Sequence, residues 1–116
     1  PVPLHPKKLK RRGYNQSACF AEGLSQVMKV PVLANGLKRI KDTETQTNKS
    51  RFSRWENVKD VFEAENKELL QGKNVLIVDD IITTGATMEA CIHALNAVQV
   101  KSVSVASIGY VTDEVV

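Results

Sequence analysis

The sequence of 116 residues has only two cysteines and no long hydrophobic run. Cys19 and Cys91 stand alone, without a CxxC pair or paired histidines, so neither a zinc site nor a disulfide framework is predicted, and both thiols are expected to be free and buried. Apolar runs such as Val75–Val78 are far shorter than the roughly 18 residues of a membrane span, and no signal-peptide pattern is present. These absences predict a cytoplasmic protein that does not enter a membrane.

The sequence is also poor in aromatic residues, at 5%, and lacks both common phosphate-binding motifs. The absence of GxxxxGK[ST] and of GxGxxG excludes a P-loop nucleotide site and a Rossmann dinucleotide site. Few aromatic rings also disfavour a groove for single-stranded DNA, which normally stacks bases on such rings. The 42% of apolar and 25% of charged residues are typical of a globular protein, and the length predicts a single domain over residues 1–116.

Charge is divided unevenly along the chain. Residues 1–59 hold thirteen lysines and arginines against four acidic residues, whereas residues 60–116 hold three against nine. Five of the basic residues lie close together in the sequence: Lys7, Lys8, Lys10, Arg11 and Arg12. Such a cluster predicts a contact with nucleic acid or with a polyphosphate, and a solvated face is the alternative.

The first half of the chain predicts one helix and two short strands. Asn15 or Ser17 is a candidate cap for a helix that ends before Pro31. The predicted buried stripe of this helix consists of Phe20, Leu24, Val27 and Met28. Residues 30–33 and 37–40 are strand-like on either side of the Asn35–Gly36 turn signal. Residues 42–57 are almost entirely polar, which predicts a mobile loop with a functional role.

The second half predicts a strand, a turn, a helix and a second strand. Residues 75–78 have the β-branching and continuous apolarity of a strand that is buried on both faces. A turn at residues 83–85 leads to a helix over residues 86–98, whose buried stripe consists of Met88, Cys91, Ile92 and Leu95. A further strand is predicted over residues 103–108. This alternation predicts an α/β fold with right-handed crossovers, in which ligands bind beyond the carboxyl ends of the strands.

The segment 75–87, VLIVDDIITTGAT, places polar groups at such a strand end. The carboxylates of Asp79 and Asp80 can accept hydrogen bonds from sugar hydroxyls, while Gly85 lets backbone N–H groups approach a phosphate closely. Further hydroxyl donors come from Thr83, Thr84 and Thr87. Acceptors for sugar hydroxyls on one side and donors for a phosphate on the other predict a site for a ribose 5-phosphate. In the alternative interpretation, Asp80 only caps the turn and the threonines only cap the helix.

This segment resembles the signature with which type I phosphoribosyltransferases bind phosphoribosyl pyrophosphate (PRPP). Other segments resemble the ComF branch of that superfamily, the competence-associated proteins; they are Pro3–His5, Lys7–Arg12, Gly13–Gln16 and the loop that holds Gln46, Arg54 and Asn57. The resemblance covers nearly the whole chain and implies a three-layer α/β fold with a mainly parallel central sheet. It also implies a fragment, whose N-terminal hood would precede Pro1 and whose first central strand would end at Val2–Leu4.

By this resemblance, Asp79 and Asp80 are the candidate catalytic residues, which bind the ribose hydroxyls of PRPP and hold Mg²⁺ through those hydroxyls or through water. The 5-phosphate is expected to be wrapped by Thr83, Thr84, Gly85, Ala86 and Thr87. A basic loop over residues 5–12 is expected to face the pyrophosphate through His5, Lys7, Lys8, Arg11 and Arg12. The loop over residues 42–57 is expected to close over the site with Lys49, Arg51 and Arg54.

The resemblance leaves two functions open. One is an Mg²⁺-dependent phosphoribosyltransferase whose acceptor is not a purine base, since Thr83 stands where the purine-salvage enzymes have an acidic residue. The other is a PRPP- or nucleotide-binding module without turnover, which acts with partner proteins in DNA uptake. The same resemblance implies a homodimer, and direct binding of nucleic acid is disfavoured.

Overall fold

The computed structural model describes residues 1–41 and 60–112. Their helices are α1 (Pro6–Arg12), α2 (Gln16–Met28), α4 (Lys67–Leu70) and α5 (Ala86–Asn96), and their strands are β1 (Leu37–Arg39), β2 (Phe62–Ala64), β3 (Asn74–Ile82) and β4 (Ser102–Tyr110). The loop predicted over residues 42–57 lies outside the described ranges. Within those ranges, no helix is long and apolar enough to cross a membrane.

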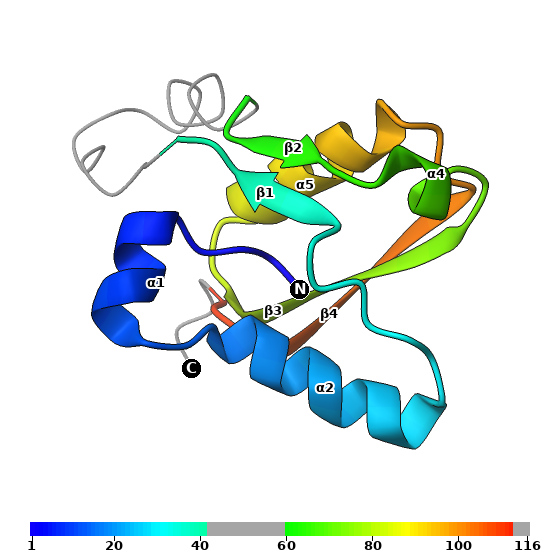
Figure 1. Ribbon diagram of the computed structural model, residues 1–116. Coiled ribbons are helices and arrows are strands. Elements are labelled where there is room, and N and C mark those ends of the chain that lie inside the picture. Colours follow the sequence, from blue (N-terminus) through cyan, green and yellow to red (C-terminus); the bar gives the residue numbers. More distant parts are fainter. Residues whose placement is uncertain (42–59, 113–116) are drawn as a thin grey trace.

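β3 and β4 form a parallel pair, in register from Asn74 opposite Ser102 to Ile82 opposite Tyr110. The helix α5 connects them, so the predicted order of strand, helix and strand is confirmed. Figure 1 shows α2 on one side of this pair and α5, with β1 and β2, on the other side. The layers and the parallel pair give the α/β class that the sequence predicts.

The core forms where α5 packs against β2 and β3. Met88, Cys91 and Leu95 are buried along one side of α5 and Ile92 is partly buried beside them, which confirms the predicted stripe. Burial raises the pKa of the Cys91 thiol to about 12, so this cysteine stays protonated and unreactive. The prediction of a second buried thiol is wrong, because Cys19 lies on the solvent side of α2 and is exposed.

The helix α2 begins as predicted, but the side that it buries only partly matches the predicted stripe: Leu24 faces β3, whereas Val27 does not. The side chain of its N-cap residue, Asn15, accepts a hydrogen bond from the N–H group of Ser17 at 2.9 Å. The predicted apolar stripe is wrong at its end, because Val27 is 82% exposed and Met28 is 52% exposed. Ser17 and Ala21 are buried instead. Both lie where α2 packs against β3, and the hydroxyl of Ser17 donates to Asp79 of that strand.

The strand predicted over residues 30–33 does not form. β1 pairs instead with β2, in antiparallel register from Leu37 opposite Ala64 to Arg39 opposite Phe62. Pro31 has no N–H group to donate to a sheet, and the segment around it lines an apolar groove. The strand prediction for the first side of the turn is therefore wrong, and only the second side becomes a strand.

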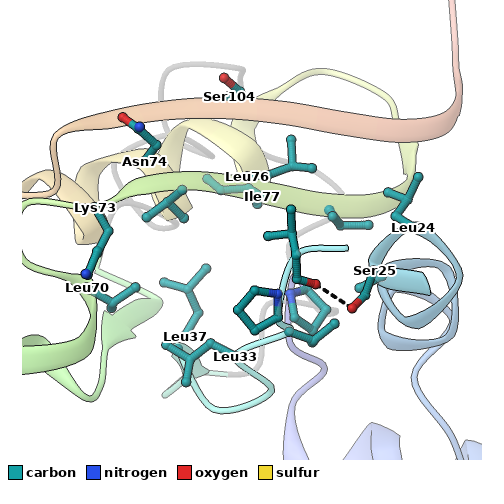
Figure 2. A pocket seen from close by; sticks show the side chains of 18 of the residues that line it. Leu24, Ser25, Leu33, Leu37, Leu70, Lys73, Asn74, Leu76, Ile77 and Ser104 are labelled. Atoms are coloured by element: carbon teal, nitrogen blue, oxygen red, sulfur yellow. Dashed lines mark hydrogen bonds between the residues drawn. The ribbon is translucent and has the colours of Figure 1, made fainter. Parts of the chain in front are cut away.

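The apolar groove has a volume of about 660 Å³ and runs beneath β3. Figure 2 shows Leu24 and Ser25 of α2 on one side of it and Leu33, Leu37 and Leu70 on the other. Its lining is dominated by leucine, valine and proline side chains, which offer little to recognise a polar ligand.

The N-terminal segment lies beside β3. The N–H group of Val2 donates to the carbonyl oxygen of Val78 at 2.8 Å. Carbonyls of successive residues in a strand point to opposite edges. The carbonyl of Lys73, five residues before Val78, accepts from Ser102 of β4, so Val2 occupies the edge of β3 away from β4. The segment expected to end a central strand therefore does run along β3, although residues 2–4 are not themselves a strand.

Candidate functional site

A polar hollow of about 210 Å³ lies at the carboxyl end of β3. Its lining comes from parts of the chain that are far apart in the sequence: Val2, Pro3 and Leu4; Lys8 and Arg12 of α1; Asn15, Gln16 and Ser17 at the start of α2; Arg39 of β1; Asp79 and Asp80 of β3; and Thr87 of α5. Open α/β sheets bind their ligands at this end of the strands. The hollow therefore lies at the end of the strand where a ligand is expected, and its lining contains carboxylate, cationic and hydroxyl groups.

The two carboxylates are each held by a local backbone donor. One oxygen of Asp79, Oδ1, accepts a hydrogen bond from the N–H group of Asp80 at 2.8 Å and a second from the hydroxyl of Ser17 at 3.0 Å. The Oδ1 atom of Asp80 accepts from the N–H group of Ile81 at 2.8 Å. Both side chains are therefore oriented before any ligand arrives.

The electrostatics of the carboxylate pair favour a ligand that donates hydrogen bonds or carries positive charge. Burial raises the pKa of the Asp79 carboxyl, and the nearby charge of Asp80 acts in the same direction. The hydrogen bonds from the Asp80 N–H group and from the Ser17 hydroxyl act against this rise. Sugar hydroxyls or a bound cation would relieve the remaining repulsion between the two acids.

The basic segment before this site is a helix, so the prediction of a loop over residues 5–12 is wrong. Pro6 occupies the first turn of α1, and Nδ1 of the N-cap residue His5 accepts a hydrogen bond from the N–H group of Lys7 at 3.2 Å. The helix ends at Gly13, whose φ of 91° is left-handed and whose N–H group donates to the carbonyl of Leu9 at 2.7 Å.

Because the segment is helical, its cations do not all face the same way. Lys8 and Arg12 are one turn apart on the same side of α1, and both line the hollow. Lys7 and Arg11 lie on another side and are exposed, and neither lines the hollow. His5 caps the helix rather than lining the site. Of the five residues predicted to face a pyrophosphate, the structure brings two to the hollow.

Arg39 is a third cation of the hollow, and the sequence reasoning missed it. Its guanidinium lies 4.8 Å from the ring centroid of Phe62, which faces it on β2. The sequence did contain a signal for Arg39. In a strand, Leu37 and Arg39 lie on the same face, so an inward-facing Leu37 implies that the charged Arg39 also faces inward. Three cations and two carboxylates thus meet in one small space.

The predicted phosphate turn is next to the hollow rather than inside it. Gly85 directly precedes α5 and has a left-handed φ of 85°. This conformation would be strained for any residue with a side chain. The hydroxyl of Thr84 accepts a hydrogen bond from the N–H group of Ala86 at 3.3 Å. Thr87 lines the hollow, whereas Thr83, Thr84, Gly85 and Ala86, which precede it in the chain, do not. The predicted contacts of Lys49, Arg51 and Arg54 lie outside the described residues.

Comparison with known proteins identifies the class. Residues 15–112 match the model of the phosphoribosyl transferase domain, so the chain belongs to that family. It is 38% identical over 106 residues to Competence protein F of Haemophilus influenzae, which covers 90% of this chain and 46% of that protein. It is 36% identical over 87 residues to the DNA utilization protein YhgH of Escherichia coli K12, which covers 75% of this chain and 37% of that protein.

Within the family, the chain is a member of the ComF-like branch of type I phosphoribosyltransferases. Competence protein ComFC of Bacillus subtilis is 29% identical to it over 96 residues, covering 82% of this chain and 36% of that protein. The chain spans less than half the length of each of these relatives. No solved structure matches the chain significantly.

Proposed function

We propose that this domain binds PRPP together with Mg²⁺ and transfers the phosphoribosyl group to an acceptor other than a purine base. The observation that supports this most is the polar hollow near the carboxyl end of β3, which is lined by Asp79 and Asp80 together with Lys8, Arg12 and Arg39. A ligand that carries hydroxyls at one end and a concentrated negative charge at the other matches this polarity. PRPP is such a molecule.

Each part of PRPP has a counterpart among the described residues. The carboxylates accept hydrogen bonds from the ribose hydroxyls, and the three cations hold the pyrophosphate. The 5-phosphate lies at the turn before α5, where Gly85 permits close approach of the backbone and the N-terminus of an 11-residue helix favours an anion. Thr84 and Thr87 add hydroxyl donors there.

The residues present fit a magnesium ion that is shared with the substrate. Among the described residues no cluster of three or more metal-binding side chains exists, but Asp79 and Asp80 supply two hard carboxylate groups. Mg²⁺ is commonly bound by one or two carboxylates together with substrate phosphates and water rather than by a complete protein cage. When bound, it would neutralise charge on the pyrophosphate, and Asp79 and Asp80 would hold it through the ribose hydroxyls or water.

Transfer in such a site requires no covalent nucleophile. The bond between the anomeric carbon and the pyrophosphate oxygen breaks, the pyrophosphate leaves with the bonding electron pair, and a nitrogen of the acceptor forms the new bond. The sugar is cation-like at the transition state, so the rate comes from positioning and charge stabilisation. Lys8, Arg12 and Arg39 hold the departing charge, and Asp79 and Asp80 hold the ribose in place.

Thr83 bears on the identity of the acceptor. The purine-salvage enzymes of the superfamily have an acidic residue at this position, which serves a ring nitrogen of the incoming base. A threonine hydroxyl does not ionise in the physiological pH range, so it is a poor substitute for that acid. An acceptor other than a purine therefore fits this chain better.

Calorimetry tests the binding half of the proposal. PRPP with Mg²⁺ should bind the wild-type protein, and Asp79→Asn combined with Asp80→Asn should weaken binding about a hundredfold, since two charge-assisted contacts are lost. Circular dichroism shows whether the double variant is folded. Absence of binding to the wild-type protein would reject both the transferase and any PRPP-binding module.

A second candidate function is a PRPP-binding module without turnover that acts in DNA uptake with partner proteins in the cytoplasm. The names of the relatives, competence and DNA utilization proteins, favour it. Release of pyrophosphate with a panel of nitrogen acceptors separates the candidates, because only the transferase releases it. Direct DNA binding would instead fall steeply with salt and survive the double substitution.

A further inference from the structure

A closed circuit of hydrogen bonds ties the start of α2 to the carboxylate of Asp79. The N–H group of Val2 donates to the carbonyl of Val78 at 2.8 Å, and Nδ2 of Asn15 donates to the carbonyl of Val2 at 3.0 Å. The Oδ1 atom of Asn15 accepts from the N–H group of Ser17 at 2.9 Å, and the hydroxyl of Ser17 donates to Asp79 at 3.0 Å. Because Asp79 follows Val78 in the chain, the circuit returns to its start.

Ser17 is an unusual residue to bury at this position. It is only 4% exposed, and a buried hydroxyl needs an acceptor. The acceptor is a carboxylate that lies 62 positions away in the sequence, and hydrogen bonds to ionised acceptors are about twice as strong as neutral ones. An alanine would fill the same space as well, so packing alone does not require the hydroxyl.

The contact with Ser17 determines how Asp79 is presented to a ligand. Two protein donors, the N–H group of Asp80 and the hydroxyl of Ser17, both use the Oδ1 atom of Asp79. A ligand hydroxyl must therefore be recognised by the second oxygen, Oδ2. If the Ser17 donor is lost, a single donor holds the carboxylate, and its plane can turn about the terminal torsion, which is a soft one.

We propose that Ser17 is a positioning residue, which fixes the carboxylate of Asp79 so that its second oxygen recognises a ribose hydroxyl. Asn15 acts one step further back, because it fixes the N–H group of Ser17 and anchors the start of α2 to Val2. This inference rests on the proposed function. It assigns a role to the Gly13–Gln16 segment and the serine after it, which the binding of PRPP described above does not use.

Calorimetry with two probes tests the inference. Ser17→Ala should weaken the binding of ribose 5-phosphate about tenfold, since a charge-assisted hydrogen bond that orients the carboxylate is lost. The binding of inorganic pyrophosphate, which is held by Lys8, Arg12 and Arg39, should stay within about twofold of the wild type. Ser17→Thr keeps the hydroxyl and should restore most of the affinity for ribose 5-phosphate.

A matched control and a double variant separate positioning from folding. Ser25→Ala removes another hydroxyl from α2, one that donates to the carbonyl of Val30 and lies on the apolar groove, so it should leave both affinities unchanged. In an Asp79→Asn background, Ser17→Ala should cause no further loss, because Ser17 acts through the charge and orientation of that residue.

Equal weakening of both probes by Ser17→Ala would overturn the role of Ser17, and so would additive losses from Ser17→Ala and Asp79→Asn. If neither probe nor PRPP binds the wild-type protein, the proposed function fails first and the role of Ser17 fails with it. If the wild type binds both probes and Ser17→Ala is indistinguishable from it, only the positioning role is rejected.

Discussion

Two cavities lie against the same strand, β3, and differ in almost every chemical property. The groove beneath β3 has a volume of about 660 Å³ and is lined mainly by leucine, valine and proline side chains. The hollow at the carboxyl end of β3 has a volume of about 210 Å³ and holds three cations and two carboxylates. The larger cavity is therefore the poorer candidate for a polar substrate. Position on the sheet is a better guide to the site than volume.

The side chains of the two cavities also have opposite effects on the stability of the fold. Side chains such as Leu95 and Ile77 line the groove and belong to the buried core, so their burial stabilises the fold. In the hollow, burial raises the pKa of Asp79, which means that the charged form of this residue costs stability. Ligand-binding groups commonly carry such a cost. The two regions should therefore respond differently to substitution.

The largest effect is expected in the apolar region. Leu95→Ala removes a side chain that is only 1% exposed and should lower the free energy of unfolding by about 2–5 kcal/mol. The affinity for PRPP and Mg²⁺ should stay close to that of the wild type at a temperature where both proteins are folded. Urea unfolding and calorimetry measure the two quantities. A large loss of affinity in the folded variant would mean that the two regions are not separable.

A smaller effect is expected from a pair of charge reversals on α1. Lys8→Glu places an acid in the hollow and should weaken the binding of pyrophosphate about tenfold or more. Lys7→Glu makes the same chemical change one residue away, on an exposed side of the helix, and should change the affinity by about twofold at moderate salt. Equal losses in calorimetry would show that α1 acts through its overall charge and not through the side that lines the hollow.

The smallest effect concerns pH. The raised pKa of Asp79 means that the folded protein binds a proton there at higher pH than the unfolded chain, whose value is near 3.8. Near pH 7 the ionised carboxylate of Asp79 therefore lowers the free energy of unfolding. This destabilisation disappears as the pH falls through the raised pKa and the carboxyl group becomes protonated. Asp79→Asn should therefore be more stable than the wild type at pH 7, and its advantage should shrink towards pH 3.8.

Urea unfolding of both proteins at a series of pH values measures this difference. An advantage that stays constant or grows as pH falls would show that Asp79 is not destabilised by its burial.

The parts of the molecule that follow local rules were predictable from the sequence. The continuous apolar run at residues 75–78 predicts β3, and the stripe of Met88, Cys91 and Leu95 predicts the buried side of α5. The acid pair lies near the end of β3, and Gly85 directly precedes α5, as the order of residues along the chain predicts. Each of these features depends on residues that are neighbours in the sequence, which is why a pattern reveals them.

The features that sequence reasoning missed depend on contacts between distant segments. Arg39 reaches the hollow only because β1 pairs with β2, and Ser17 meets Asp79 across 62 positions. The buried side of α2 was predicted only in part: Leu24 lies against β3 as expected, but the most buried residues are the small Ser17 and Ala21, whereas Val27 is exposed. The helix α1 was missed because its signals, a proline in the first turn and a glycine after the last, were outweighed by its charge.

The most direct test of the contrast between the two cavities is a titration of the isotopically labelled protein with PRPP and Mg²⁺, followed by nuclear magnetic resonance of its backbone amides. Binding in the polar hollow predicts shifts at Ser17, Asp80 and Thr87, and none at Leu24 or Leu70 of the apolar groove. Shifts concentrated at the groove residues, or no shifts at a saturating concentration of PRPP, would contradict the assignment of the site.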